Sequence, residues 1–498
     1  MNGSVRAAAV RSARPAARPA TSRDPLLVVL AILAVLPAIA CAARPRPSIV
    51  LITIDTLRPD HLGCYGYTRS TSPHIDALAA QSTRFDRAYT SLPRTTQSVA
   101  SILTGRYPKS HGARGLFARL PATNKTLAEV LKDNGYETAA VVSNTFLRPG
   151  QGFEQGFDWY ENPERRWDAD SAADVTASAQ HWLDEGHDQG PFFLWVHYLD
   201  PHWRYAPPPP YDHAFDAGFK DPFTLYADLD AGLLTKGQVI FDDVLSPATT
   251  QHVVSLYDGE IAATDQAIGL LLARLDRIAR PLLVVLTADH GESLGEHGYR
   301  FAHGEYLYEQ GLRIPLLVRF PGSVPAGRRF SGLAMNIDVA PTILGLLKID
   351  GMQSVEGRPL FVPGPAVAGG AAGAEGFEPA PGRPLVFAES DYELIHPENR
   401  RHYVNGPTGR WTSAADDRYK LIQIPHAGEE ALELYDLQAD PGELRDLSAS
   451  NHHQEIRLRL LRALRQFADY GTGPTPTVEP EPLNQEDRDR LRSLGYVN

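Results

Sequence analysis

Four short apolar runs recur along the chain, and amphipathic segments separate them. The runs are Ser48–Ile54, Thr138–Val142, Phe192–Val196 and Leu282–Thr287. The segments between them include two helical patterns, Asn124–Asn134 and Val253–Leu275. Buried strands that alternate with helices favour an α/β domain built on a mostly parallel sheet. This alternation is the feature that most restricts the fold.

Polar residues follow each of the four apolar runs. They are Asp55, Ser143-Asn144, His197 and Asp289-His290. In open α/β sheets, ligands bind beyond the carboxyl ends of the strands. We therefore expect these side chains to line one pocket.

The segment 93–106 predicts a helix with a hydroxyl group in its first turn. Pro93 cannot lie inside a helix, Thr95 or Thr96 suits the N-cap, and Gly105 marks the C-terminal end. An apolar stripe at helical spacing is formed by Val99, Ile102 and Leu103. The start of a helix carries unpaired amide donors and partial positive charge, so a hydroxyl there can attack a tetrahedral anion. The segment thus indicates phosphate or sulfate ester chemistry, and the alternative is an ordinary capped surface helix.

Composition restricts the size of the fold and the kind of partner. The 498 residues include 43% hydrophobic residues, which is enough for one large domain and a smaller one. The formal net charge is -12, from 48 basic and 60 acidic residues. This balance argues against a nucleic-acid partner, so an anionic substrate must be bound by a local site.

Residues 1–41 predict an export signal. Several arginines precede an uncharged run over residues 25–40, and small residues stand just before Cys41. This order resembles a bacterial lipoprotein signal, with Cys41 lipidated and the protein held at the membrane of the cell envelope or periplasm. Simple cleavage and an uncleaved N-terminal anchor are the alternatives. Cys64 is the other cysteine, so no disulfide framework is expected and Cys64 should be packed rather than reactive.

The remaining chain divides by composition. Residues 47–350 hold the predicted α/β domain, and residues 351–383 are a predicted linker rich in Gly, Ala and Pro. Residues 384–470 predict a small C-terminal α+β subdomain, and residues 471–498 form a tail. The subdomain should contain strands at 384–388, 419–424 and 433–437 and an amphipathic helix at 454–470.

A divalent metal site is expected where the strand-end carboxylates meet the helix start. Asp55, Asp289 and His290 would converge with Thr95. A threonine hydroxyl is a poor nucleophile at neutral pH, and a bound cation lowers its pKa. Mixed oxygen and nitrogen ligands favour Zn or Mn over Ca or Mg.

Two further histidine-rich segments follow the third and fourth apolar runs, at 197–202 and 297–303. Within them, His202 and His303 are candidates to hold a second metal, to bind a nonbridging oxygen of the substrate, or to protonate the leaving group. His197 lies closer to its strand, and we expect it to be structural.

From about Ser48 to Leu447 the chain resembles the sulfatase family of the alkaline phosphatase superfamily. The motifs that carry the resemblance come in the family's order and include Asp60-His61-Leu62-Gly63, Leu103-Thr104-Gly105-Arg106, Asp289-His290-Gly291-Glu292 and Leu434-Tyr435-Asp436. The resemblance implies an alkaline-phosphatase-like α/β sandwich with a mostly parallel central sheet and a small C-terminal subdomain. It also implies hydrolysis or transfer at a sulfate or phosphate ester.

The chain departs from the family pattern at the nucleophile. Sulfatases carry a Cys or Ser that becomes formylglycine, whereas Thr95 stands at that position here. Threonine is neither a thiol nor a primary alcohol, so no formylglycine is expected. The family's Asp-Asn metal pair is here Asp289-His290, and the second N-terminal Asp is Thr56. These four positions look instead like those of relatives that use a Thr nucleophile on zinc or manganese, namely nucleotide phosphodiesterases, phosphoethanolamine transferases and lipoteichoic acid synthases.

Carried over to this sequence, the resemblance implies a role for each candidate residue. Asp55, Asp289 and His290 would be metal ligands, and Thr95 the metal-bound nucleophile. Asn144 would donate to a nonbridging oxygen, and two residues would serve a second metal or the leaving group, namely His202 and His303. The predicted substrate is a small-molecule, glycan-linked or lipid-linked anionic ester.

We predict phosphoester hydrolysis or transfer in preference to sulfate ester hydrolysis. A sulfated threonine would have no easy route to hydrolysis, whereas formylglycine hydrate can eject sulfate. One alternative is a genuine sulfuric ester hydrolase of the arylsulfatase kind, and another is an inactive binding or scaffold protein on this fold.

Overall fold

The structure is a computed structural model, which describes residues 45–115, 117–163, 171–219, 225–234, 239–240, 243–367, 376–390, 410–426, 429–469 and 485. Residues 46–498 form one compact unit. The predicted signal at 1–41 lies outside the described residues, as does the predicted tail apart from Gln485. Among the described helices, none has the length and apolar character needed to cross a bilayer.

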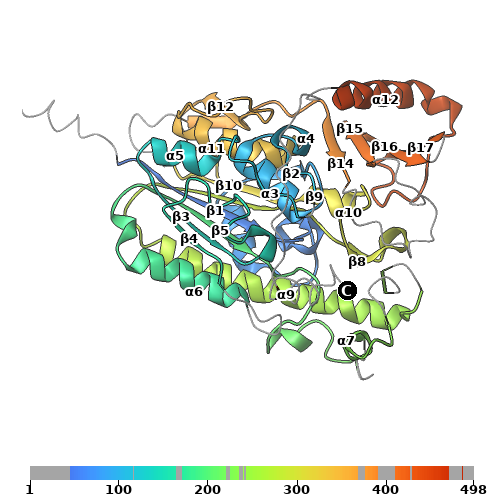
Figure 1. Cartoon of the computed structure of the whole chain (residues 1–498), viewed down its shortest axis with the longest axis horizontal. Coiled ribbons are helices and arrows are strands. Elements are labelled where there is room, and N and C mark those ends of the chain that lie inside the picture. The colour runs from blue at the N-terminus through green and yellow to red at the C-terminus, as the bar shows by residue number, and fades with distance from the viewer. Residues whose placement is uncertain are drawn as a thin grey trace, which may run out of the picture. The chain divides into compact units, whose positions relative to one another are not determined.

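A central sheet runs through the large domain (Figure 1). Its strand order is β11-β2-β10-β6-β1-β5-β3-β4, with β9 beside β2. The strands are β1 (Ser48–Ile54), β2 (Thr83–Tyr89), β3 (Glu137–Val142), β4 (Trp159–Glu161), β5 (Phe192–Tyr198), β6 (Leu282–Ala288), β9 (Arg313–Ile314), β10 (Leu316–Arg319) and β11 (Arg328–Met335). The neighbours β6, β1, β5, β3 and β4 are all parallel, whereas β10 is antiparallel to β6 and β2. The predicted mostly parallel α/β sheet is confirmed.

Helices cover both faces of this sheet (Figure 1). On one face lie α6 (Ser171–Asp184) and the long α9 (Pro247–Leu275), and on the other lie α3 (Thr95–Thr104), α5 (Leu127–Asp133) and α11 (Val339–Leu347). Smaller helices include α2 (Pro73–Ala80), α4 (Pro108–His111), α7 (Leu225–Asp230) and α10 (Glu309–Leu312). The sheet is thus the middle layer of a sandwich, and its inner parallel strands β6, β1 and β5 are buried along their whole length.

All four predicted apolar runs form strands, because each buries its apolar side chains between the helix layers. The helices also form where expected, with ends set by their caps. A capping box at Thr126 and Glu129 begins α5, and the Ser246 hydroxyl accepts from the Thr249 amide to begin α9 upstream of the predicted start.

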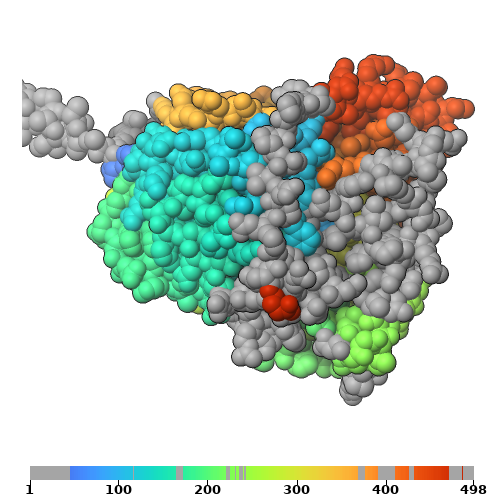
Figure 2. Space-filling view, viewed as in Figure 1, coloured from blue at the N-terminus to red at the C-terminus, as the bar shows by residue number. Residues whose placement is uncertain are grey.

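The C-terminal subdomain is a four-stranded antiparallel sheet with one helix packed on it. Its elements are β14 (Val386–Glu389), β15 (Thr412–Ala415), β16 (Tyr419–His426), β17 (Glu429–Asp436) and α12 (Gln454–Asp469). Leu460 and Leu464 of α12 pack against Leu421 and Leu434 of the sheet. Figure 2 shows this subdomain, in orange and red, seated against the large domain. The predicted α+β subdomain is present.

The predicted linker is partly structured. Strands β12 (Phe361–Gly364) and β13 (Gly376–Pro379) pair antiparallel within it, and Phe361 and Phe377 join the core of the large domain. The predicted linker therefore contains a short hairpin that packs on the large domain through these two aromatic side chains. Residues 368–375 of this stretch lie outside the described residues.

Candidate active site

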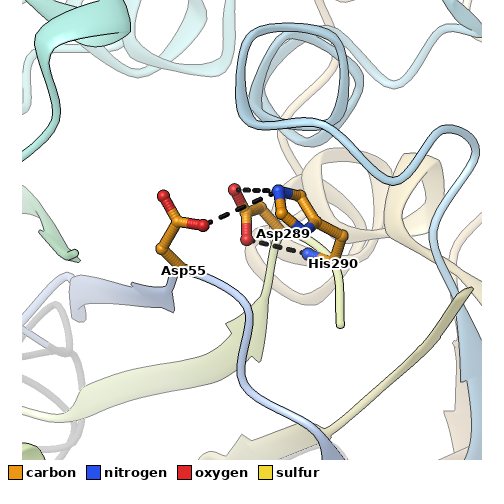
Figure 3. A group of neighbouring side chains, drawn as sticks. All are labelled: Asp55, Asp289 and His290. Carbon is orange, nitrogen blue, oxygen red and sulfur yellow. Dashed lines mark hydrogen bonds and ion pairs between the residues drawn. The ribbon is translucent and has the colours of Figure 1, made fainter. Parts of the chain in front are cut away.

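Three of the predicted ligands meet at the carboxyl edge of the central sheet. Asp55 directly follows β1, and Asp289 and His290 directly follow β6, the strand paired with β1. Figure 3 shows the two carboxylates and the imidazole turned toward one another. All three side chains are fully buried. One ligand atom from each lies within 4.8 Å of the others, a grouping that can hold a metal ion.

Thr95 lies beside this group, as predicted. Its Oγ1 is 3.3 Å from Asp55 Oδ2 and 3.5 Å from His290 Nε2. The backbone of α3 is fixed to the end of β6, because the Ser98 hydroxyl donates to the Asp289 carbonyl at 2.6 Å. The nucleophile candidate and the metal-ligand candidates therefore form one cluster.

The start of α3 differs from the prediction by one residue. Arg94, with φ -148° and ψ 141°, is the N-cap, and Thr95 is the first helical residue. Because Arg94 adopts the extended backbone of the cap, the Thr95 hydroxyl is free of the capping role and faces the carboxylates. All ten residues of α3 are buried, so the alternative of a surface helix is wrong. Gly105 ends the helix with φ 65°, as expected.

The three candidate ligand atoms of this cluster are suited to bind a cation. His290 Nδ1 lies 2.9 Å from the Gly291 carbonyl, which can only accept, so Nδ1 carries the proton of the neutral ring. Nε2 is then an acceptor, and it faces Asp55 Oδ1 at 3.6 Å and Asp289 Oδ2 at 3.5 Å. Within the described parts of the chain, neither of those oxygens has a hydrogen-bond partner. Three buried acceptor atoms that face one another suit a divalent metal with mixed oxygen and nitrogen ligands.

Burial and neighbouring charges shift the pKa values of Asp289, His290 and Asp55. Burial and the neighbouring charge of Asp55 raise the pKa of Asp289 well above its usual value. Burial lowers the pKa of His290 to about 4, so the ring is neutral at pH 7. Burial also disfavours the charged form of Asp55, but the His197 imidazole 3.7 Å away and the other nearby imidazoles outweigh it and lower the pKa of Asp55.

Two predicted residues support Asp55 directly. Asn144, just beyond β3, donates from Nδ2 to Asp55 Oδ2 at 2.7 Å, and its Oδ1 accepts from the Phe146 amide. Its predicted donation to substrate stays a prediction. His197 lies inside β5 rather than beyond its end, since the strand runs on to Tyr198. Its Nδ1 is 2.8 Å from Thr53 Oγ1 and its Nε2 is 3.7 Å from Asp55 Oδ2, in agreement with a structural role.

His202 and His303 also belong to the cluster. The ring centroid of His303 is 4.3 Å from that of His290 and 5.1 Å from that of His202. Both side chains are buried. His202 Nδ1 lies 2.5 Å from the Trp203 carbonyl oxygen, which fixes the direction of its ring. The structure therefore brings together all seven predicted site residues.

Residues outside the prediction also contribute to the site. The carboxylate of Glu292 lies 3.2 Å from His303 Nδ1, and Arg94 forms an ion pair with Glu305 at 2.8 Å. Glu292 stands in the Asp-His-Gly-Glu motif, and that motif is its signal in the sequence. The pairing of Arg94 with Glu305 depends on the packing of distant segments and has no local signal.

Two residues lie apart from the cluster's chemistry. His297 stacks on Tyr308 with centroids 3.6 Å apart, and burial lowers its pKa. Burial and the charge of Asp76 raise the pKa of Cys64 to about 12, so the thiol stays protonated as expected for a packed cysteine.

Comparison with known proteins gives a consistent family. The sequence model of the Sulfatase family matches residues 47–349. The chain is 24% identical to N-acetylglucosamine-6-O-sulfatase of Bacteroides thetaiotaomicron, over 87% of this chain and 89% of that protein. It is 25% identical to an arylsulfatase of Clostridium perfringens, over 84% of this chain and 93% of that protein.

Solved structures share the fold. BT4656 in complex with its substrate D-glucosamine-2-N,6-O-disulfate has a TM-score of 0.69 at 22% identity, over 87% of this chain and 99% of that one. A phosphonate monoester hydrolase of Agrobacterium radiobacter also has a TM-score of 0.69, at 21% identity, over 88% of this chain and 100% of that one. One fold therefore carries both sulfatases and phosphonate hydrolases.

Proposed function

The chain belongs to the sulfatase family and is a sulfatase-like ester hydrolase, and within that family we propose that it cleaves phosphorus esters by attack of Thr95 with the help of a divalent metal. Members of the family typically bind such a metal. Zn or Mn is the proposed ion, because the site combines carboxylate and imidazole ligands.

The observation that carries the proposal is the place of the Thr95 hydroxyl. Its Oγ1 lies within 3.5 Å of both Asp55 and His290, at the first residue of a buried helix. The amide groups of the first turn and the partial positive charge of the helix start favour an anion at this point. A secondary alcohol there supports direct phosphoryl transfer rather than formylglycine chemistry.

Asp55, Asp289 and His290 would hold the cation, which when bound lowers the pKa of the Thr95 hydroxyl and offsets charge on the ester oxygens. Thr95 Oγ1 loses its proton to solvent and forms a bond to phosphorus. The bond from phosphorus to the ester oxygen breaks, and that oxygen leaves as an alcohol after taking a proton from an imidazole at the site. His202 and His303 are the candidates for that donor.

The second half of the reaction releases the phosphothreonine. A water molecule, or an acceptor alcohol, attacks phosphorus and gives its proton to the imidazole that became deprotonated in the first step. The bond from phosphorus to Thr95 Oγ1 breaks, which regenerates the hydroxyl once it is reprotonated. Asn144 is placed at the edge of the same cluster, where its amide can orient an oxygen of the substrate.

The charges at the site favour a substrate with one negative charge. A dication would balance Asp55 and Asp289, and the Arg94 guanidinium is already paired with Glu305. A second negative charge on the substrate would therefore be buried without a counterion among these side chains. Phosphonate monoesters and phosphodiesters meet this condition, and phosphonate monoester hydrolases are among the structural relatives.

Sulfate esters are the second candidate substrates, because several relatives are sulfatases. One is N-acetylglucosamine-6-O-sulfatase and another is the ulvan-active sulfatase of Formosa agariphila. A sulfate monoester also carries one negative charge, so it meets the same condition. The objection is chemical, since a sulfated Thr95 would be released slowly.

The deciding experiment compares four substrates on the metal-loaded protein: 4-nitrophenyl phenylphosphonate, bis(4-nitrophenyl) phosphate, 4-nitrophenyl phosphate and 4-nitrophenyl sulfate. We expect turnover of the first two, with phosphorylated or phosphonylated Thr95 found by mass spectrometry after rapid quenching. Faster turnover of the sulfate would reverse the preference. A protein that binds no metal and turns over none of the four would be the scaffold alternative.

From the sequence alone, we also propose export to the cell envelope with lipidation at Cys41. Metabolic labelling with a fatty acid should mark the wild-type protein and not the C41A variant. Equal labelling of both would contradict this assignment.

A further inference from the structure

A buried carboxylate, Glu292, binds the imidazole of His303. Glu292 Oε1 is 3.2 Å from His303 Nδ1, and the Tyr205 hydroxyl donates to Glu292 Oε2. The Glu292 side chain is fully buried and that of His303 nearly so. Glu292 follows His290 by two residues, so the segment after β6 supplies both a metal-ligand candidate and this carboxylate.

The hydrogen bond fixes how the His303 ring is used. A carboxylate that receives the Tyr205 hydroxyl on one oxygen accepts from His303 Nδ1–H on the other. The opposite ring nitrogen, Nε2, is then the atom that meets other groups. The rings of His290 and His202 have centroids 4.3 and 5.1 Å from that of His303, so the oriented ring lies in the candidate active site.

The backbone that carries His303 is held as firmly as its ring. The Tyr299 hydroxyl donates to the His303 carbonyl at 3.2 Å, and Glu305 binds Arg94. Gly304 has φ 103°, which favours glycine, and a Cβ there would stand 2.1 Å from Arg94 Nε and displace the Arg94 guanidinium. The loop thus joins His303 to the residue that precedes Thr95.

We propose that Glu292 is the positioning residue that holds His303 to deliver a proton to the departing ester oxygen, an inference that rests on the proposed function. The proton moves from His303 Nε2 to the ester oxygen as the bond from phosphorus to that oxygen breaks. The Nδ1–H stays on the ring and remains bonded to Glu292. In the second step the attacking water returns a proton to Nε2, so the cycle balances.

Replacement of the carboxylate by an amide tests this role. Glu292→Gln keeps the size of the side chain, an acceptor for His303 and a partner for Tyr205, but removes the negative charge beside the ring. We expect kcat/KM to fall about 10- to 100-fold for the phenyl ester of phenylphosphonate and less than about 3-fold for its 4-nitrophenyl ester. The 4-nitrophenolate leaves readily without a proton, whereas phenolate needs one more.

The matched control is Asp258→Asn, which makes the same change in a buried carboxylate bound to a histidine elsewhere. Asp258 Oδ1 lies 2.7 Å from His61 Nδ1. Whatever this variant does to stability, its remaining activity should show the leaving-group dependence of the wild type. An equal loss on both esters in Glu292→Gln, or no loss, would overturn the proposal, as would loss of bound metal in that variant.

A spectroscopic readout keeps the test independent of turnover. In protein labelled with ¹⁵N-histidine, His303 should show a protonated Nδ1, with its resonance assigned by its absence in His303→Gln. Tyr205→Phe should leave this signal, and Glu292→Ala should shift it. An unchanged signal in Glu292→Ala would contradict the positioning role. Wild-type protein that cleaves neither ester would contradict the proposed function instead. The NMR signal would still show whether Glu292 binds His303.

Discussion

The structure contains two groups of buried carboxylates, and their hydrogen-bond partners differ. One group is centred on Asp258 and the other on Asp55. Asp258 in α9 is fully buried, and its two oxygens are bound by His61 at 2.7 Å, Tyr67 at 2.6 Å and Arg69 at 2.7 Å. Asp55 and Asp289 are as deeply buried, yet Asp55 Oδ1 and Asp289 Oδ2 have no hydrogen-bond partner among the residues that the structure describes. The first group is complete in itself, and the second leaves two oxygens to bind the cation that we propose.

The difference separates a structural cluster from a functional one. Burial of a charge is costly unless a partner offsets it, so a satisfied carboxylate such as Asp258 needs no further explanation. Two carboxylates within reach of one unprotonated imidazole nitrogen are unstable by themselves, and such sites persist where a ligand stabilises them. The family's typical use of a divalent metal agrees with this interpretation.

Substitution of Thr95 should have the greatest consequence for activity. Thr95→Ala removes the proposed nucleophile and should lower kcat/KM on the aryl phosphonate by at least about 10³-fold. The matched control is Thr104→Ala at the far end of α3, where the hydroxyl only donates to the Ala100 carbonyl. Steady-state assays of the two variants check this, and a Thr95→Ala enzyme with more than about a tenth of wild-type activity would rule out the nucleophile.

Metal removal should affect stability through the proposed ligands Asp55, Asp289 and His290. At a free ion concentration of about 100 to 1,000 times Kd, the ion stabilises the folded chain by about 3 to 4 kcal/mol. Chelation should therefore lower the Tm of wild type and of Asp258→Asn, but not that of Asp55→Asn. Differential scanning fluorimetry with and without chelator measures this, and equal shifts in all three would place the ion elsewhere.

In the metal-free protein, substitution of Asp258 should lower stability, whereas substitution of Asp289 should not. Asp258→Asn leaves Arg69 and His61 without their carboxylate and should reduce the free energy of unfolding by about 3 kcal/mol. Asp289→Asn removes a charge that the Asp55 carboxylate opposes, so the stability should stay equal or rise. Urea unfolding of both variants compares them. A large loss of stability in metal-free Asp289→Asn would contradict the account.

Another buried carboxylate, Asp265, is expected to give the smallest effect. It accepts from the amides of His74 and Ile75, but burial raises its pKa to about 6. The folded state then binds a proton that the unfolded state releases near pH 4, so stability falls as pH rises from about 4 to 6, by roughly 2 kcal/mol. Unfolding curves at pH 4 and pH 6 measure this change in the free energy of unfolding. The change should be smaller in Asp265→Asn than in the wild type, and an equal change in both proteins would contradict the prediction.

Most of the fold and the core of the site could be predicted because their signals are local. The run Ser48–Ile54 is apolar throughout most of its length, and Asp55 is the first residue after it. Parallel strands bring their carboxyl ends to one edge, so Asp55 and Asp289 are expected to meet although 234 positions separate them.

The remaining features depend on packing between distant segments. Hydroxyl residues suit caps, which favours a threonine at the N-cap, yet Arg94 takes that place while its side chain binds Glu305 in another loop. The low-complexity stretch carries no sign that Phe361 and Phe377 enter the core. His61 and Asp258 likewise pair across 197 residues, and neither carries a local signal of the other.

The most direct test is anomalous X-ray diffraction from crystals of the purified protein, recorded at the zinc and manganese edges. We expect a peak bonded to Asp55, Asp289 and His290, with ligand distances of about 2.0 to 2.2 Å and Thr95 Oγ1 next to it. A map with no peak between these three side chains, from crystals of protein that cleaves the aryl phosphonate, would contradict it.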